Sequence, residues 1–187
     1  MGTGSRMTQS DKMQAALLER VVPKLMEQGF AGEYPHFRRV FSDRIELLGF
    51  VQHQYGVAFN VEVSVIFPQR PKEQSNHSLQ GLEPPEKATV FSTRKRFRLK
   101  GMFDGWFYYT DVYKSTRVLA NKQTYETFEA VGEQRKRGFI PGPNQVLVQQ
   151  ADDALHANIA DEVNRQMEDA YAWLKQHNTP ARLRKAK

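Results

Sequence analysis

Residues 57–67 alternate between apolar and polar side chains along a long run. The odd positions hold Val57, Phe59, Val61, Val63, Val65 and Phe67, and the even positions hold Ala58, Asn60, Glu62 and Ser64. A period of two predicts a β-strand with one buried and one wetter face, and the β-branched and aromatic odd residues favour the same structure. A slip by one residue would carry Glu62 into the core, so we expect a well-specified register.

Apolar residues at helical spacing predict a helix over residues 11–28, with N-cap candidates in residues 8–11. Pro23 lies inside this run and should kink or divide the helix, because it lacks a backbone donor. Gly29 and Phe30 then predict a C-terminal cap, with Gly29 left-handed and Phe30 folded back onto the helix.

The middle of the chain predicts an antiparallel meander. Strands are expected at residues 36–41, 45–54 and 57–67, and Gly49 suggests a bulge in the second. Short connections force neighbouring strands to be antiparallel. Residues 68–88 are rich in proline and polar residues and are expected to form a long flexible loop.

The second half predicts strands at residues 89–100 and 106–113, a short helix at 125–131 and a long helix at 152–177. Asp152 and Asp153 suit the positive end of that last helix. The expected fold is α+β, an antiparallel β-meander of about five strands with the N- and C-terminal helices packed on one face.

Length and composition favour one domain. The chain has 187 residues, a formal net charge of +6 and no cysteine. Residues 1–6 resemble a cloning remnant, residues 7–180 the domain and residues 181–187 a basic tail. No long apolar run predicts a membrane span. The lack of cysteine fits a reducing compartment, and we expect a cytoplasmic protein.

No familiar catalytic motif occurs, and the five histidines lack metal-ligand spacing. Glu46 and Glu62 are carboxylates on neighbouring predicted strands and could face one another for acid–base chemistry. Charged residues on the wet face of a sheet are the commoner explanation. We therefore expect no catalytic residue, metal or cofactor, and an enzyme with an unfamiliar site stays open as an alternative.

Four basic residues at alternate positions form the main candidate for binding. They are Arg94, Arg96, Arg98 and Lys100, and alternate positions of a strand share one face. Trp106 follows, and Arg38 and Glu62 on other strands complete the candidate binding residues. The row could be a solvated face, a surface for an anionic protein partner, or a site for phosphates and bases, and we rank them in that order.

Several short segments occur in the order known from one family. They are residues 25–30 (LMEQGF), 37–39 (FRR), 50–52 (FVQ), 59–63 (FNVEV), 96–99 (RFRL) and 104–107 (DGWF). Over residues 14–109 the chain resembles the bacterial family catalogued as domain of unknown function 4304.

The resemblance implies a small cytoplasmic sheet-and-helix domain without established activity, and it carries over no catalytic residue. Some members look like neighbours of toxin genes, which implies an immunity role. Our leading hypothesis is a non-enzymatic protein-interaction domain, with a toxin-binding immunity protein as one form. Nucleic-acid or phosphate-ligand binding through the basic row is the alternative.

Overall fold

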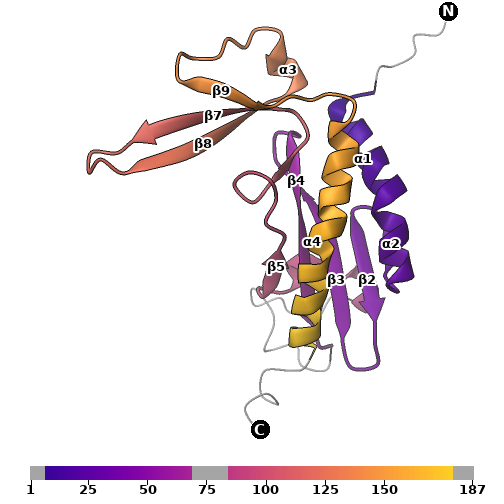
Figure 1. The fold of residues 1–187 in the computed structure, drawn as a ribbon. Coiled ribbons are helices and arrows are strands. Elements are labelled where there is room, and N and C mark those ends of the chain that lie inside the picture. Colours follow the sequence, from indigo (N-terminus) through magenta and orange to yellow (C-terminus); the bar gives the residue numbers. More distant parts are fainter. Residues whose placement is uncertain (1–6, 69–83, 179–187) are drawn as a thin grey trace, which may run out of the picture.

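The computed structural model describes residues 7–68 and 84–178 of the chain, which form two β-sheets and a layer of helices (Figure 1). The predictions for residues 1–6, for most of the loop at 68–88 and for the tail at 181–187 lie outside the described residues.

The N-terminal helix is divided as Pro23 predicts, into α1 (Gln9–Arg20) and α2 (Val22–Glu27). Thr8 caps α1 in a reciprocal capping box with Asp11. Gly29 has a φ of +82°, and the Phe30 amide donates to the Leu25 carbonyl oxygen at 3.1 Å. The predicted C-terminal cap is confirmed, and Phe30 returns to the core beside Leu25.

The main sheet is the predicted antiparallel meander. It runs in the order β1 (Ala31–Glu33), β2 (His36–Val40), β3 (Ile45–Gln52), β4 (Ala58–Ile66) and β5 (Arg96–Arg98). A two-residue strand, β6 (Phe107–Tyr108), pairs with the start of β4 along the same edge as β5. β4 is therefore an inner strand of this sheet.

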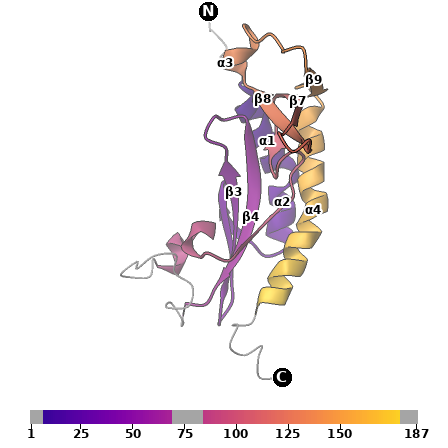
Figure 2. The ribbon, with the colours of Figure 1, turned by 90° about the vertical axis from the view of Figure 1, so that its left-hand side faces the viewer.

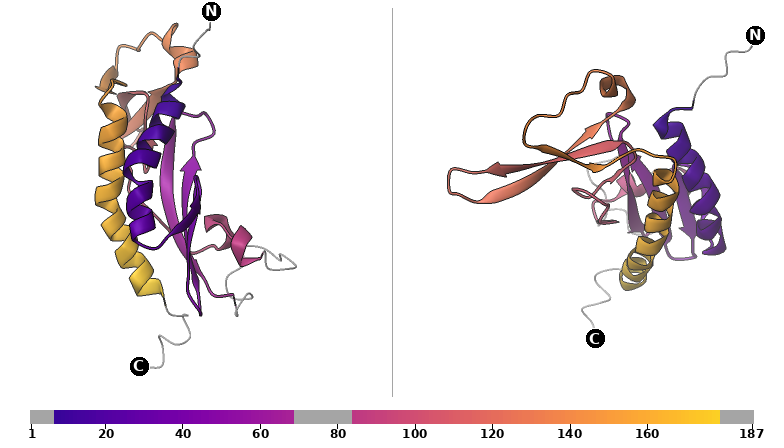
Figure 3. Two further views of the ribbon diagram at one scale, coloured as in Figure 1. Left: turned by 90° about the vertical axis from the view of Figure 1, so that its right-hand side faces the viewer. Right: turned by 45° about the horizontal axis from the view of Figure 1, so that its top comes forward.

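The terminal helices cover one face of the sheet, as expected for the α+β fold (Figure 2). The odd residues of β4 lie in one core cluster with apolar residues of α1, α2 and α4 (Leu155–His177). Asp152 precedes α4, and its Oδ1 accepts from the Leu155 amide at 2.9 Å. The side view in Figure 3 shows α1, α2 and α4 together on this side.

The opposite face of β4 is covered as well, so the prediction of a wetter face is wrong. The even residues Ala58, Asn60, Glu62 and Ser64 are all at most 3% exposed. The strand predicted over residues 89–100 is mostly absent: after the 3-10 turn η2 (Pro85–Lys87) the chain forms a second turn, η3 (Val90–Ser92), and only Arg96–Arg98 joins the sheet. Val90 packs with Ile45 and Leu47 on this second face.

Gly49 does not form the predicted bulge, because β3 pairs in unbroken register from Ile45 to Gln52. Its role is close packing: a Cβ at this position would lie 2.9 Å from Val90 Cγ2. The absence of a side chain at Gly49 thus lets Val90 of η3 pack closely against β3.

A second, three-stranded sheet was not predicted. It has the order β8-β7-β9, formed by β7 (Asp111–Val118), β8 (Thr124–Val131) and β9 (Gln145–Gln149), with the short helix α3 (Glu133–Lys136) before β9. The helix predicted at 125–131 is wrong, and the strand predicted at 106–113 is split between the two sheets. We call residues 111–149 the arm, since the β7–β8 hairpin projects away from the helices and the main sheet (Figures 1 and 3).

Replacing Gly49 should destabilise the fold by overpacking. We expect Gly49→Ala to lower the free energy of unfolding by about 1–3 kcal/mol in urea titrations, because the stiff, buried Val90 side chain must shift. Adding Val90→Ala should make the two changes less costly together than their sum. Gly138→Ala is the control, since no heavy atom lies within 4 Å of its added Cβ. Equal effects at both glycines would contradict this role.

His156 should make the fold sensitive to mild acid. It lies at the start of α4, 5% exposed, and burial and then Lys12 lower its pKa despite Asp152 and Asp153 nearby. The unfolded chain therefore binds a proton more readily, and stability falls as the pH drops below about 6.5. Unfolding of the His156→Gln variant between pH 7 and 5 should show a weaker pH dependence than wild type. If the free energy of unfolding changes equally with pH in both proteins, His156 does not contribute to the acid sensitivity of the fold.

Candidate functional site

The two central residues of the basic row are bound to a buried carboxylate. Arg96 and Arg98 stand opposite Ser64 and Glu62 in the sheet register, on the face covered by η3. Glu62 Oε1 accepts from Arg98 Nη2 at 2.7 Å and from Arg98 Nε at 3.1 Å, and its Oε2 lies 3.2 Å from Arg96 Nε. One carboxylate thus compensates part of the charge of two guanidinium groups.

The other predicted basic residues are not gathered at this cluster. Arg94 is exposed and precedes β5. Lys100 follows β5 and lies beside α4, with Nζ 4.0 Å from Asp169 Oδ2. Arg38 lies on β2, which β3 and β4 separate from β5, although it is on the same face of the sheet as Arg96. The predicted single row is therefore wrong beyond Arg96 and Arg98.

Trp106 lies against protein groups on two sides. The Arg98 guanidinium carbon is 5.6 Å from its ring centroid, and the His53 ring meets it edge-on at 4.9 Å between centroids. Cation–π contact of this kind favours the arginine in place. A base stacking on Trp106 would have to displace these groups, so the structure gives no open aromatic platform at this residue.

Glu46 and Glu62 do not face one another. In the register Glu46 stands opposite Val65 and Glu62 opposite Gly49, which places them on opposite faces of the sheet. Glu46 Oε2 accepts from Arg39 Nη2 at 2.6 Å, and Arg39 Nη1 donates to the Gln28 carbonyl oxygen at 2.6 Å. Both carboxylates are buried within ion pairs, not solvated as predicted, and Arg39 ties the end of α2 to the sheet.

Sequence reasoning missed the buried polar residues beside Glu62. Asn60 and Ser64 are fully buried, and their side-chain polar atoms have no hydrogen-bond partner within the described residues. Both were expected on a wet face. A sequence signal that could have corrected this is the pair Thr89 and Ser92, which form a capping box at η3 and so favour a turn there instead of a strand. Burying these polar atoms without a hydrogen-bond partner costs free energy.

A cavity of about 820 Å³ lies where the arm meets the rest of the molecule. Its wall includes Thr8, His53, Tyr55, Glu129, Glu133 and Arg135. The charged groups here are engaged: Arg135 Nη1 donates to Glu129 Oε1 at 2.9 Å, and Glu133 Oε1 accepts from the Gln9 amide at 3.1 Å. The cavity therefore offers an acidic and aromatic lining in which the acids already have donors.

Among the described residues the groups with shifted pKa values are mostly core residues. Burial raises the pKa of Tyr34, Tyr108, Tyr109 and Tyr171, and burial lowers that of His156. Only Tyr108 of these lines the cavity. No group of three or more metal-ligating side chains occurs in residues 7–68 and 84–178. No helix in these ranges is both long and apolar enough to cross a bilayer.

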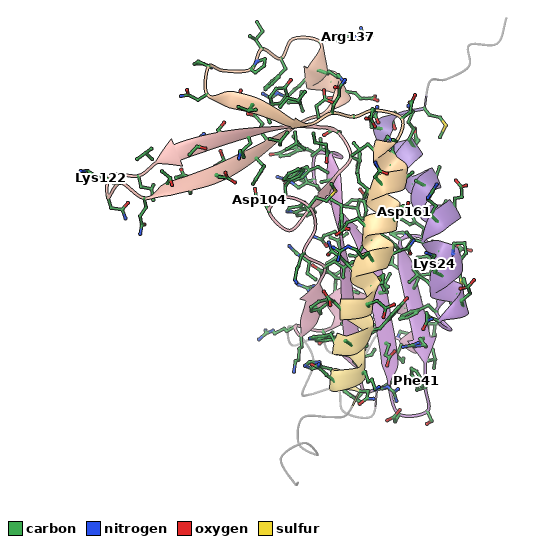
Figure 4. All side chains as sticks on the ribbon, viewed as in Figure 1. Lys24, Phe41, Asp104, Lys122, Arg137 and Asp161 are labelled. Carbon is green, nitrogen blue, oxygen red and sulfur yellow. The ribbon has the colours of Figure 1, made fainter. Side chains whose placement is uncertain are left out.

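The arm carries seven of the fourteen large exposed apolar side chains in the described part of the chain. They are Val118, Leu119, Tyr125, Ile140, Val146, Leu147 and Val148, exposed by 38–87%. Lys122 marks the end of the β7–β8 hairpin, well separated from Asp161 and Lys24 on the helices (Figure 4). Neighbouring exposed apolar residues of this kind typically mark an interaction surface.

In the comparison with known families, residues 21–176 match the model of a domain of unknown function (DUF4304). This range contains the whole main sheet, the arm and nearly all of α4. Comparison with curated proteins and with solved structures finds no match.

The Glu62 cluster should act mainly on stability. We expect Glu62→Gln to lower the free energy of unfolding by about 1–2 kcal/mol, because a charge-assisted bond is lost while the arginines can still reach water. Glu126→Gln removes an exposed ion pair with Lys114 on the arm and should cost less than about 0.5 kcal/mol. Equal costs in denaturant titrations would argue against a special role for Glu62.

Proposed function

The chain belongs to the DUF4304 family, and from this premise we propose that it acts by binding another protein through the distal part of its arm. The supporting observation is the group of exposed apolar residues on a sheet that projects from the main body. Small sheets need apolar burial to be stable on their own. A protein partner on the hairpin would provide it.

The distal hairpin suggests the chemistry of the partner. Val118, Leu119 and Tyr125 expose 68%, 46% and 40% of their surface, and Arg117 stands opposite Tyr125 in the register. Lys122 lies between the two strands at the turn. Val118 stands opposite Thr124 and therefore lies on the other face from Tyr125, so apolar side chains lie on both faces of the hairpin end beside two exposed cations. This fits a partner whose apolar pocket encloses the hairpin end and whose rim is acidic.

The geometry gives less support to the two alternative functions, which are nucleic-acid or phosphate binding and an enzyme with an unfamiliar site. Arg96 and Arg98, which would hold phosphates, are engaged with Glu62, and Arg98 lies over Trp106. The cavity at the base of the arm holds acids that already accept hydrogen bonds. Binding through the hairpin requires no rearrangement of any of these groups.

We further propose a toxin as the first class of partner to test, which would make the protein an immunity protein of the cytoplasm. The support is the resemblance described above and a chain without cysteine, which fits a reducing compartment. An acidic rim on the toxin would complement Arg117 and Lys122.

The hairpin surface should decide partner binding. We expect the protein purified from its native cells to carry a stoichiometric partner, measured by native mass spectrometry. Leu119→Asp with Tyr125→Asp should weaken that complex at least tenfold, because two apolar anchors become charged. Val40→Asp is the control, since Val40 is an apolar residue on the main sheet that is 66% exposed, more than Leu119 or Tyr125.

Two results would contradict the proposal: a complex that survives the hairpin changes, or one lost equally in the Val40 variant. The toxin form is tested by coexpression with gene products encoded beside this one. Wild type should restore growth against one of them and the hairpin variant should not. Growth restored equally by both variants would exclude the hairpin as the toxin-binding surface.

A further inference from the structure

The outer edge of β9 is a free strand edge. β9 pairs with β7 on one side, and no strand of the described part of the chain pairs with it on the other. Val146, Leu147 and Val148 are 61%, 44% and 38% exposed. Unpaired edges with apolar side chains and no proline or charge tend to add another strand.

We propose that two copies of the chain pair through β9, antiparallel about a two-fold axis at Leu147. The two arms then form one sheet in the order β8-β7-β9-β9-β7-β8. This association goes beyond the proposed function, because it uses the edge of β9 and leaves the distal β7–β8 hairpin free.

The sequence of β9 suits a two-fold axis. It reads Gln145-Val146-Leu147-Val148-Gln149, which is the same in both directions. About an axis at Leu147, Gln145 stands opposite Gln149, Val146 opposite Val148, and Leu147 opposite its own copy. The side chain of Gln149 stays within its own chain, where Nε2 donates to the Tyr108 and Thr110 carbonyl oxygens. A self-complementary interface of this kind is what an isologous dimer requires. Apolar cross-strand pairs and the absence of like charges both favour it.

The other free edge of the arm does not have this property. A two-fold axis places a residue opposite its own copy, so in β8 an axis at Thr127 sets Glu126 opposite Phe128, and an axis at Phe128 sets Glu126 opposite Ala130. Both pair a charged residue with an apolar one, which does not favour association. The β9 edge is therefore the one whose chemistry selects a second copy.

The local geometry also leaves the β9 edge accessible. Phe139 packs on Tyr113 with ring centroids 4.9 Å apart, so the loop before β9 turns onto a face of the arm. Ile140, next in that loop, is 87% exposed. A bulge at Val148 interrupts the pairing with β7 and increases the local twist, so the second copy has to follow a twisted edge at this residue. Pairing would extend a three-stranded sheet to six strands and bury apolar residues now in water.

Single cysteines can test the axis, because the chain contains none. Cα atoms of an antiparallel pair lie about 4.5–5.5 Å apart, within the range for a disulfide. Leu147→Cys should therefore give a disulfide-linked dimer under mild oxidation. Val118→Cys, at the exposed end of the hairpin, is the control and should stay monomeric.

Charged pairs can test the register. Light scattering on wild type at micromolar concentrations should give twice the chain mass of 21.6 kDa. Val146→Lys with Val148→Lys sets like charges opposite each other across the axis and should give monomers, with an unchanged circular dichroism spectrum. Val146→Lys with Val148→Glu sets opposite charges against each other and should restore the dimer.

Three results would overturn the proposal: a monomeric wild type, a dimer that persists in the double-lysine variant, or crosslinking of Val118→Cys as efficient as that of Leu147→Cys. A Val146→Lys with Val148→Glu variant that stays monomeric would overturn the antiparallel register. These outcomes are independent of partner binding at Leu119 and Tyr125, so the two proposals can fail separately.

Discussion

The structure depends on the burial of β4 on both of its faces. On one side its odd residues meet α1, α2 and α4, and on the other its even residues lie under η3 and beside β6. An antiparallel strand commonly has one face in water. Here the chain after β4 returns to cover the second face, and Gly49 leaves the space in which Val90 packs. The centre of the main sheet is consequently covered on both sides, whereas Val40 near its edge stays 66% exposed.

Burying the second face brings Glu62 into a dry environment, and this explains the arginines of β5. A buried carboxylate is costly unless it is paired and hydrogen-bonded. Arg96 and Arg98 satisfy Glu62, and in doing so they fix a strand of only three residues to the edge of the sheet. Arg96 and Arg98, which suggest a ligand site when only the sequence is considered, are thus paired with Glu62 of the same chain. The same logic applies to Arg39 and Glu46 on the helix-covered face.

The arm contrasts with this closed body. Its hairpin exposes apolar residues on both faces, and both of its outer edges lack a neighbouring strand within the described ranges. Such a sheet gains stability from whatever covers it. The hairpin end, with its two cations, suits a different protein, whereas the neutral and symmetric β9 suits a second copy. The two surfaces lie on different parts of the arm and can be used together.

The sequence by itself determined the elements whose signals are local. Pro23 divides the first helix, Gly29 ends it, and strict alternation defines β4, because backbone restriction and side-chain period act within a few residues. It did not determine what lies over each face. Asn60, Glu62 and Ser64 look solvated in sequence, and only the return of residues 88–93 buries them. β8 lacks a clear period because only one of its eight residues is buried, so tertiary pairing with β7 decided that it is a strand. The burial of Asn60, Glu62 and Ser64 and the strand conformation of β8 both depend on contacts between residues far apart in the chain, which a local sequence pattern does not reveal.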